Sequence, residues 1–142
     1  MADALVFTWS GSFRDDYGDR LDEIAALITF VRDKFEMDIG VLAEEERDTV
    51  MDELEALALD FVVGAVQDIA AVVTGIAGRY DRVFFVSDIR AELASVNQTG
   101  AFTIGYSSEA RTADELGGVG PNYIVDDLDE LQQILALEHM PG

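Results

Sequence analysis

Short apolar runs alternate with stretches of helical periodicity along the whole chain. Six runs have the composition of buried strands, and we predict strands at 4–7, 39–42, 61–63, 82–86, 102–105 and 123–125. Between them the apolar residues recur at helical spacing, which predicts helices over 19–35, 44–59, 66–77, 89–96 and 128–137. Strands that alternate with helices through short connections are typical of a parallel sheet covered on both faces.

No repeat, linker or break in composition interrupts this alternation. We therefore expect one α/β domain over residues 1–142, a three-layer Rossmann-like fold around a mostly parallel six-stranded sheet. The polar stretch from Ser107 to Pro121 predicts a loop. Its Gly117-Gly118-Val119-Gly120 segment fits neither of the Gly-rich patterns that bind nucleotides, so the sequence supports no nucleotide site.

The charge balance changes the picture of the surface. The chain has 29 acidic and nine basic residues, a formal net charge of −20, and Lys34 is its only lysine. Such a surface repels nucleic acids and anionic membranes, and we expect neither as a partner. The acids are dispersed and the core composition is ordinary, which resembles proteins of salt-accumulating, haloarchaeal cells. An ordinary acidic mesophilic protein is the alternative.

Several classes of chemistry are excluded by composition. The chain has no cysteine, so it has no disulfide, thiolate zinc site or cysteine nucleophile. Its single histidine, His139, makes no His-based triad or metal site. No apolar run reaches the ~20 residues of a membrane span, and the first residues are not signal-like. We expect a soluble, cytoplasmic domain.

Ligands of open parallel sheets bind beyond the carboxyl ends of the strands, so those positions are the candidate site. The first strand is followed by Trp9-Ser10-Gly11-Ser12, and the second by Ala43-Glu44. Neither Ser10 nor Ser12 has a base nearby in the sequence, and both are expected to serve turn formation and capping rather than nucleophilic catalysis. Trp9 is expected to pack in the core, with a stacking wall for a ligand as the alternative.

Three segments of the second half carry a family resemblance. Val83-Phe84-Phe85-Val86-Ser87-Asp88, followed by Glu92, resembles the fourth motif of the haloacid dehalogenase (HAD) superfamily of phosphatases and related hydrolases. Gly100–Tyr106 is similar to that family's "AG-x-x-T-I-G" strand, and Gly120–Leu131 to its "GADYVIDSLDEL" ending. The resemblance covers nearly the whole chain and implies that the strands beginning at Ala4 and Arg82 are neighbours at the sheet centre. The short first connection leaves no room for a cap domain, so the cleft should be open.

The same resemblance implies a vestigial cleft, because most of the family's catalytic groups are replaced. Family members carry D-x-D-G-T after the first strand, with a nucleophile Asp and an acid Asp, where this chain has Thr8 and Ser10. The family's Ser or Thr falls on Ala43, and its Lys falls near Gln67. The acidic positions of the fourth motif remain as Asp88 and Glu92, the candidate metal ligands. The alternatives are an N-cap of the next helix for Asp88 and a solvated helix face for Glu92.

We therefore expect a catalytically inactive HAD-like domain that acts as a binding, regulatory or assembly module, with a protein partner or a second copy of itself. An aspartyl-phosphate mechanism needs a carboxylate nucleophile, and a threonine hydroxyl without a base does not replace it. No catalytic residue and no cofactor are expected. The alternative is a weak or divergent Mg²⁺-dependent phosphatase or hydrolase that uses Asp88 and Glu92.

Overall fold

The computed structural model describes residues 2–108 and 112–139. The described chain forms six strands and seven helices in the order β1 Ala4–Thr8, α1 Gly11–Tyr17, α2 Leu21–Phe35, β2 Asp38–Leu42, α3 Arg47–Glu53, β3 Phe61–Val63, α4 Ile69–Ala77, β4 Val83–Ser87, α5 Arg90–Asn97, β5 Phe102–Tyr106, α6 Ala113–Gly117, β6 Tyr123–Val125 and α7 Leu128–Glu138.

All six strands belong to one sheet, and every pairing is parallel. The strand order is β3-β2-β1-β4-β5-β6, so the first and fourth strands are neighbours at the centre, as predicted. Leu5 pairs with Phe84 and Phe7 with Val86 across this central contact. The crossover at β1 separates the two halves of the sheet and creates the switch point at which such sheets bind ligands.

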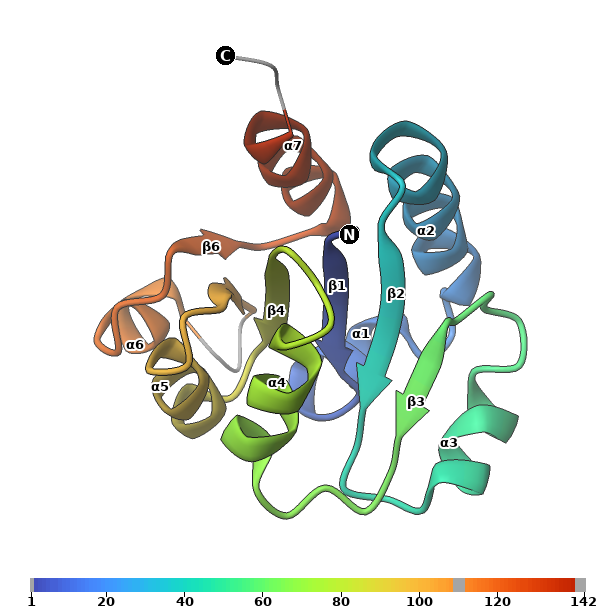
Figure 1. Cartoon of the computed structure of the whole chain (residues 1–142), viewed down its shortest axis with the longest axis horizontal. Helices are drawn as coiled ribbons and strands as arrows, with labels where there is room; N and C mark the ends of the chain where they lie inside the picture. The colour runs from blue at the N-terminus through green and yellow to red at the C-terminus, as the bar shows by residue number, and fades with distance from the viewer. Residues whose placement is uncertain (1, 109–111, 140–142) are drawn as a thin grey trace.

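Two hydrophobic layers cover the sheet. Alternate residues of β1 pack into one layer or the other, because successive strand side chains point to opposite faces. Leu5 and Phe7 face the layer that contains α1, α2, α3 and α7, while Ala4 and Val6 face α4, α5 and α6 (Figure 1). Their side chains are fully or almost fully buried. No described helix is long and apolar enough to cross a bilayer.

The helices depart from prediction in four places. The segment after β1 forms the unpredicted helix α1, and the stretch expected to be a loop at 107–121 contains α6, with 109–111 outside the described residues. The helix predicted over 44–59 is reduced to α3, because Glu45 is drawn into the loop by Arg14 and by the amide of Ala65. The helix predicted from 66 begins at Ile69, since Asp68 caps it by accepting from the Ala71 amide.

Candidate functional site

Main-chain hydrogen bonds hold the carboxyl ends of β1, β2 and β3 together beyond the strands. The Trp9 amide donates to the Leu42 carbonyl over 2.9 Å, and the Ala43 amide donates to Val63 over 3.0 Å. The chain that leaves β3 returns to this edge, where the Val66 amide donates to Ala43, also over 3.0 Å. This ladder positions the residues after each strand independently of their side chains.

A cavity of about 180 Å³ opens at this edge, between the strand ends and helices α4 and α5. Five of the six positions predicted for the cleft line it: Thr8, Ser10, Ala43, Gln67 and Glu92. These residues come from four separate segments of the chain, and the structure brings them to one place. Asp88 lies beside them without lining the cavity.

The hydroxyls of Thr8 and Ser10, at the positions of the aspartates in the resembled motif, are both withdrawn from solvent. Thr8 is 3% exposed, and its Oγ1 donates to the main-chain carbonyl of Val86 over 3.4 Å. The Oγ atom of Ser10 is buried and has no hydrogen-bond partner in the described part of the chain. The Thr8 hydroxyl also interacts with the Glu92 carboxylate, whereas Ser10 Oγ contacts no base among the described residues.

Asp88 has a different role from the expected helix cap. Its side chain is fully buried, and Oδ2 accepts a hydrogen bond of 2.6 Å from the Ser12 amide, in the first turn of α1. The residue that caps α5 is Ile89, whose amide donates to Ser87 Oγ over 3.0 Å. The interpretation of Asp88 as the cap of α5 is therefore wrong: the carboxylate satisfies an amide at the beginning of α1 instead.

Gly11 makes room for this carboxylate. Its φ of +57° lies in the left-handed region, and a β-carbon there would stand 2.5 Å from Oδ2 of Asp88. A side chain is excluded for both reasons, backbone conformation and space. The Ser-Gly-Ser turn is thus built around Asp88.

Glu92 does not lie on a solvated helix face. It is half-buried, lines the cavity, and its Oε1 accepts a hydrogen bond of 2.8 Å from Ser87 Oγ. Burial raises the pKa of Glu92, and the charges of Glu44 and Asp88 raise it further, against hydrogen bonds from Ser87 and Thr8 that lower it. A negative charge at Glu92 is therefore only partly compensated.

The oxygen donors at this edge make a poor Mg²⁺ site. The unpartnered Oδ1 of Asp88 and the unpartnered Oγ of Ser10 are buried oxygens that suit a hard cation. Only one of them is charged, because the aspartates of the resembled motif are absent. Among the residues described, the three carboxylates that do come within 4.8 Å of one another are Asp126, Asp127 and Glu130, outside this cavity. The donor set fits at most a weakly held ion.

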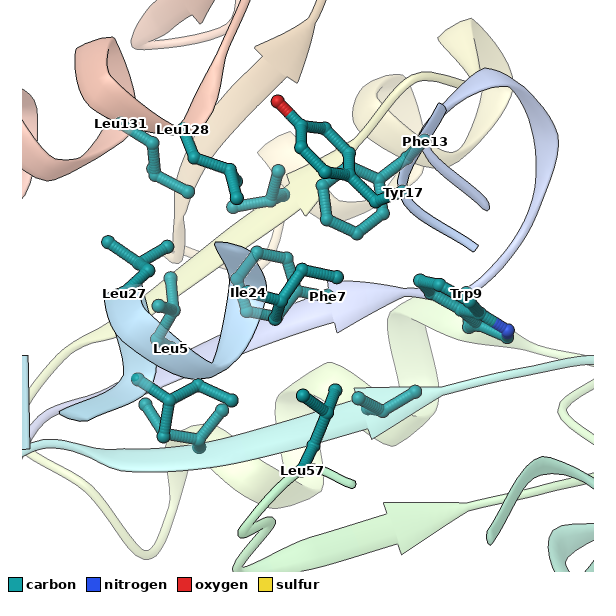
Figure 2. Close-up of a cluster of buried hydrophobic side chains, with 14 of the residues drawn as sticks. Leu5, Phe7, Trp9, Phe13, Tyr17, Ile24, Leu27, Leu57, Leu128 and Leu131 are labelled. Atoms are coloured by element: carbon teal, nitrogen blue, oxygen red, sulfur yellow. The ribbon is translucent and has the colours of Figure 1, made fainter. Parts of the chain in front are cut away.

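Trp9 packs in the core, as predicted. Its ring is 2% exposed and meets Phe13 edge to face, with ring centroids 6.0 Å apart. Figure 2 shows Trp9 at the end of β1, at the margin of the cluster that also contains Phe7 and Phe13. Trp9 is not among the residues that line the cavity, so the alternative of a stacking wall is not supported.

Sequence reasoning missed some features of this end of the sheet. Ser95 lines the cavity, and its position three residues after Glu92 on α5 is the signal that could have indicated it. A second, wider hollow of about 810 Å³ lies near α1 and α6 and is lined in part by Asp15, Asp16 and Asp126. Its acids are scattered in the sequence, and no local pattern brings them together.

The comparisons with known proteins establish the fold. No family profile and no curated protein matches the sequence. Among solved structures, a predicted phosphatase from Clostridium acetobutylicum is similar with a TM-score of 0.69 and 20% identity, over 89% of this chain and 67% of that one. A haloacid dehalogenase-like family hydrolase from Streptococcus pneumoniae has a TM-score of 0.60 and 14% identity, over 82% of this chain and 56% of its own.

A third structure covers almost the whole of this chain. The 3-deoxy-D-manno-octulosonate 8-phosphate phosphatase from Moraxella catarrhalis, solved with magnesium, phosphate and its KDO molecule, has a TM-score of 0.63 and 11% identity, over 96% of this chain and 86% of its own. The fold is that of HAD-like phosphatases. It is a single α/β domain with helices on both faces of the sheet, and no cap domain interrupts the described residues.

Proposed function

We propose that this chain is a HAD-fold domain that binds a ligand or partner without hydrolysing phosphate esters, and that it acts as a binding, regulatory or assembly module in a halophilic cytoplasm. The observation that supports this most directly is the end of β1. The position at which the resembled motif has its nucleophile holds Thr8, whose hydroxyl donates to Val86. An aspartyl-phosphate mechanism needs a carboxylate as its nucleophile, and a threonine hydroxyl that is bonded to a main-chain carbonyl and to Glu92 does not replace it.

The charge around the cavity supports the same proposal. Phosphoryl transfer depends on cations that neutralise the developing charge. Among the residues that the structure describes, no basic side chain lines the cavity. Arg14, the basic residue of α1, is engaged by Glu45 and Glu53, with its Nη2 2.8 Å from Oε2 of Glu53. A phosphate ester would meet carboxylates where a phosphatase provides cations.

A second candidate is a divergent Mg²⁺-dependent hydrolase. The similarity to structures named as phosphatases favours it, as does the unpartnered Oδ1 of the buried Asp88. In that case Asp88, with the Ser10 hydroxyl, would hold the ion, and the ion would supply charge neutralisation for a bound phosphate. Glu92 would then remain at the cavity wall as the second acid.

Hydrolysis of an aryl phosphate with Mg²⁺ at high KCl separates the two candidates. We expect turnover no higher for the wild type than for Asp88→Ala, and the same for Asp88→Asn, which keeps an acceptor for the Ser12 amide. The control is Asp33→Ala, which removes an exposed acid of α2. Turnover that persists in the control and disappears in both Asp88 variants would establish the hydrolase instead.

A further inference from the structure

The cavity at the end of β1 has a lining of one charge sign. Its polar wall consists of Thr8, Ser10, Glu44, Gln67, Glu92 and Ser95. In the described part of the chain, the charged groups of the lining are the carboxylates of Glu44 and Glu92, and no Lys, Arg or His is among them. Carboxylates only accept hydrogen bonds, so a ligand has to bring the donors.

An anion fits this wall badly. A phosphate offers acceptor oxygens and negative charge, and it would place them against two carboxylates without a basic side chain among the lining residues. The half-buried Glu92 is already disfavoured as a charged group by its burial, which raises its pKa. A positive ligand would remove this penalty, whereas an anion would increase it.

The apolar part of the lining indicates that the cation carries carbon. It consists of Leu42, Ala43, Val66, Ile69 and Ala91, and a hydrated metal ion gains nothing from contact with such side chains. The volume of about 180 Å³ is close to that of the ~150 Å³ engineered cavity that holds benzene, which indicates a small ligand. The buried Ser10 Oγ, which has no partner in the described chain, offers a further acceptor at the polar wall.

We propose that this cavity binds a small organic ammonium ion, with its charged nitrogen donating to Glu92 and Glu44 and its hydrocarbon part against Leu42, Val66 and Ile69. The proposal rests on the proposed function, because it gives a ligand class to a cleft that does not process phosphate. It also accounts for a cleft that has carboxylates and no lysine among its described lining residues.

The test is a titration of the full chain followed by NMR of the methyl groups that line the cavity. The probes are n-butylammonium chloride, 1-butanol as its uncharged analogue, inorganic phosphate and MgCl₂, each at low and at high KCl. We expect butylammonium to shift the methyl signals of Ile69 and Val66 and to bind more tightly than butanol at both salt concentrations. Phosphate should leave these signals unchanged.

Matched variants identify which carboxylate holds the ammonium ion. Glu92→Gln should weaken butylammonium binding about tenfold, since a hydrogen bond to a charged group is lost, and leave butanol binding unchanged. Glu44→Gln should weaken butylammonium binding less, because Glu44 is exposed and its carboxylate stays hydrated. The control is Glu55→Gln, which removes the same charge at an exposed position away from this cavity.

Three results would overturn the proposal. Equal affinities for butylammonium and butanol would show that the cavity selects only apolar groups. Equal losses of butylammonium affinity in Glu92→Gln and Glu55→Gln would show that only the overall charge of the protein matters. Methyl signals that shift with phosphate or Mg²⁺ and not with butylammonium would show that the cavity binds an inorganic ion instead of an organic ammonium ion. The hydrolysis assay distinguishes failure of this inference from failure of the proposed function. If the chain neither binds butylammonium nor hydrolyses the aryl phosphate, only this inference is refuted. Hydrolysis that depends on Asp88 would refute the proposed function.

Discussion

The Asp88 carboxylate occupies the space that a side chain on Gly11 would need. Oδ2 stands 2.5 Å from the position of a β-carbon on Gly11, and the same atom accepts from the Ser12 amide over 2.6 Å. The two contacts join the end of β4 to the beginning of α1. This corner therefore depends on a glycine and an acid that lie far apart in the sequence.

Gly11→Ala should lower the free energy of unfolding by about 3 kcal/mol, combining left-handed backbone strain with the collision at Asp88. Gly100→Ala is the matched control, because Gly100 also has a positive φ, of +87°, but has open space around its β-carbon position. It should cost only about 1 kcal/mol. Urea unfolding of both variants measures the difference.

The same comparison in an Asp88→Ala background tests the cause. Without the carboxylate, Gly11→Ala should cost no more than Gly100→Ala, because only backbone strain remains. An unchanged penalty in that background would show that Asp88 is not what excludes a side chain.

Introducing the two aspartates of the resembled motif should create ion binding and not catalysis. Thr8→Asp with Ser10→Asp adds two carboxylates to the edge that holds Asp88, so Mg²⁺ affinity measured by calorimetry should rise. Turnover of an aryl phosphate should stay at background, because no lysine replaces Gln67 and catalytic groups act as a unit. Substantial turnover in the double variant would show that the remaining groups suffice.

Tyr80 should make stability depend on pH in the alkaline range. Burial raises its pKa to about 12, and so does Asp38, whose Oδ2 accepts from the tyrosine hydroxyl over 2.8 Å. The unfolded chain loses this proton near pH ~10, earlier than the folded chain. Stability is therefore fully present below about pH 10 and falls as pH rises towards 12.

Tyr80→Phe should flatten this decline in urea midpoints measured across the alkaline range, and Asp38→Asn should reduce it partly. Both effects follow from the order of the causes, burial first and the Asp38 hydrogen bond second. Identical alkaline slopes in wild type and Tyr80→Phe would remove Tyr80 as their source.

Thermal stability should rise steeply with KCl. The net charge is −20, and the Debye length shrinks from ~10 Å at about 0.1 M salt to ~3 Å at about 1 M, which relieves repulsion among the 29 acids. Thermal melts across this range measure the effect, with a sodium sulfate series to separate cation effects from general salting out. A flat or falling melting temperature in KCl would contradict the halophilic habitat.

The strands of the sheet were predictable because each one is specified by a short local stretch of sequence. Each buried strand is a short apolar run bounded by turn residues, and the central pairing of β1 with β4 followed from the family resemblance. Helix α1 was missed because its apolar residues are few: Phe13 and Tyr17 are buried, and Phe13 is held by Phe7 at 5.2 Å between ring centroids. That contact is tertiary, so the periodicity of apolar residues in the sequence does not predict it.

The site was predictable in position and not in detail. Thr8, Ala43 and Gln67 meet because parallel strands end at one edge, which strand order alone determines. The role of Asp88 depends on Ser12, 76 residues away in the sequence, and local reasoning assigned it to the adjacent helix instead. The predictions failed where a side chain is satisfied by a distant main-chain group.

The placement of Trp9 gives the chain a built-in optical probe. It is the only tryptophan, it stands between Thr8 and Ser10, and its indole nitrogen is buried without a partner in the described chain. All indole fluorescence therefore originates one residue from the cavity, inside the core rather than in water. A shift in tryptophan emission reports directly on rearrangement at the end of β1, with no label attached and no second tryptophan to subtract.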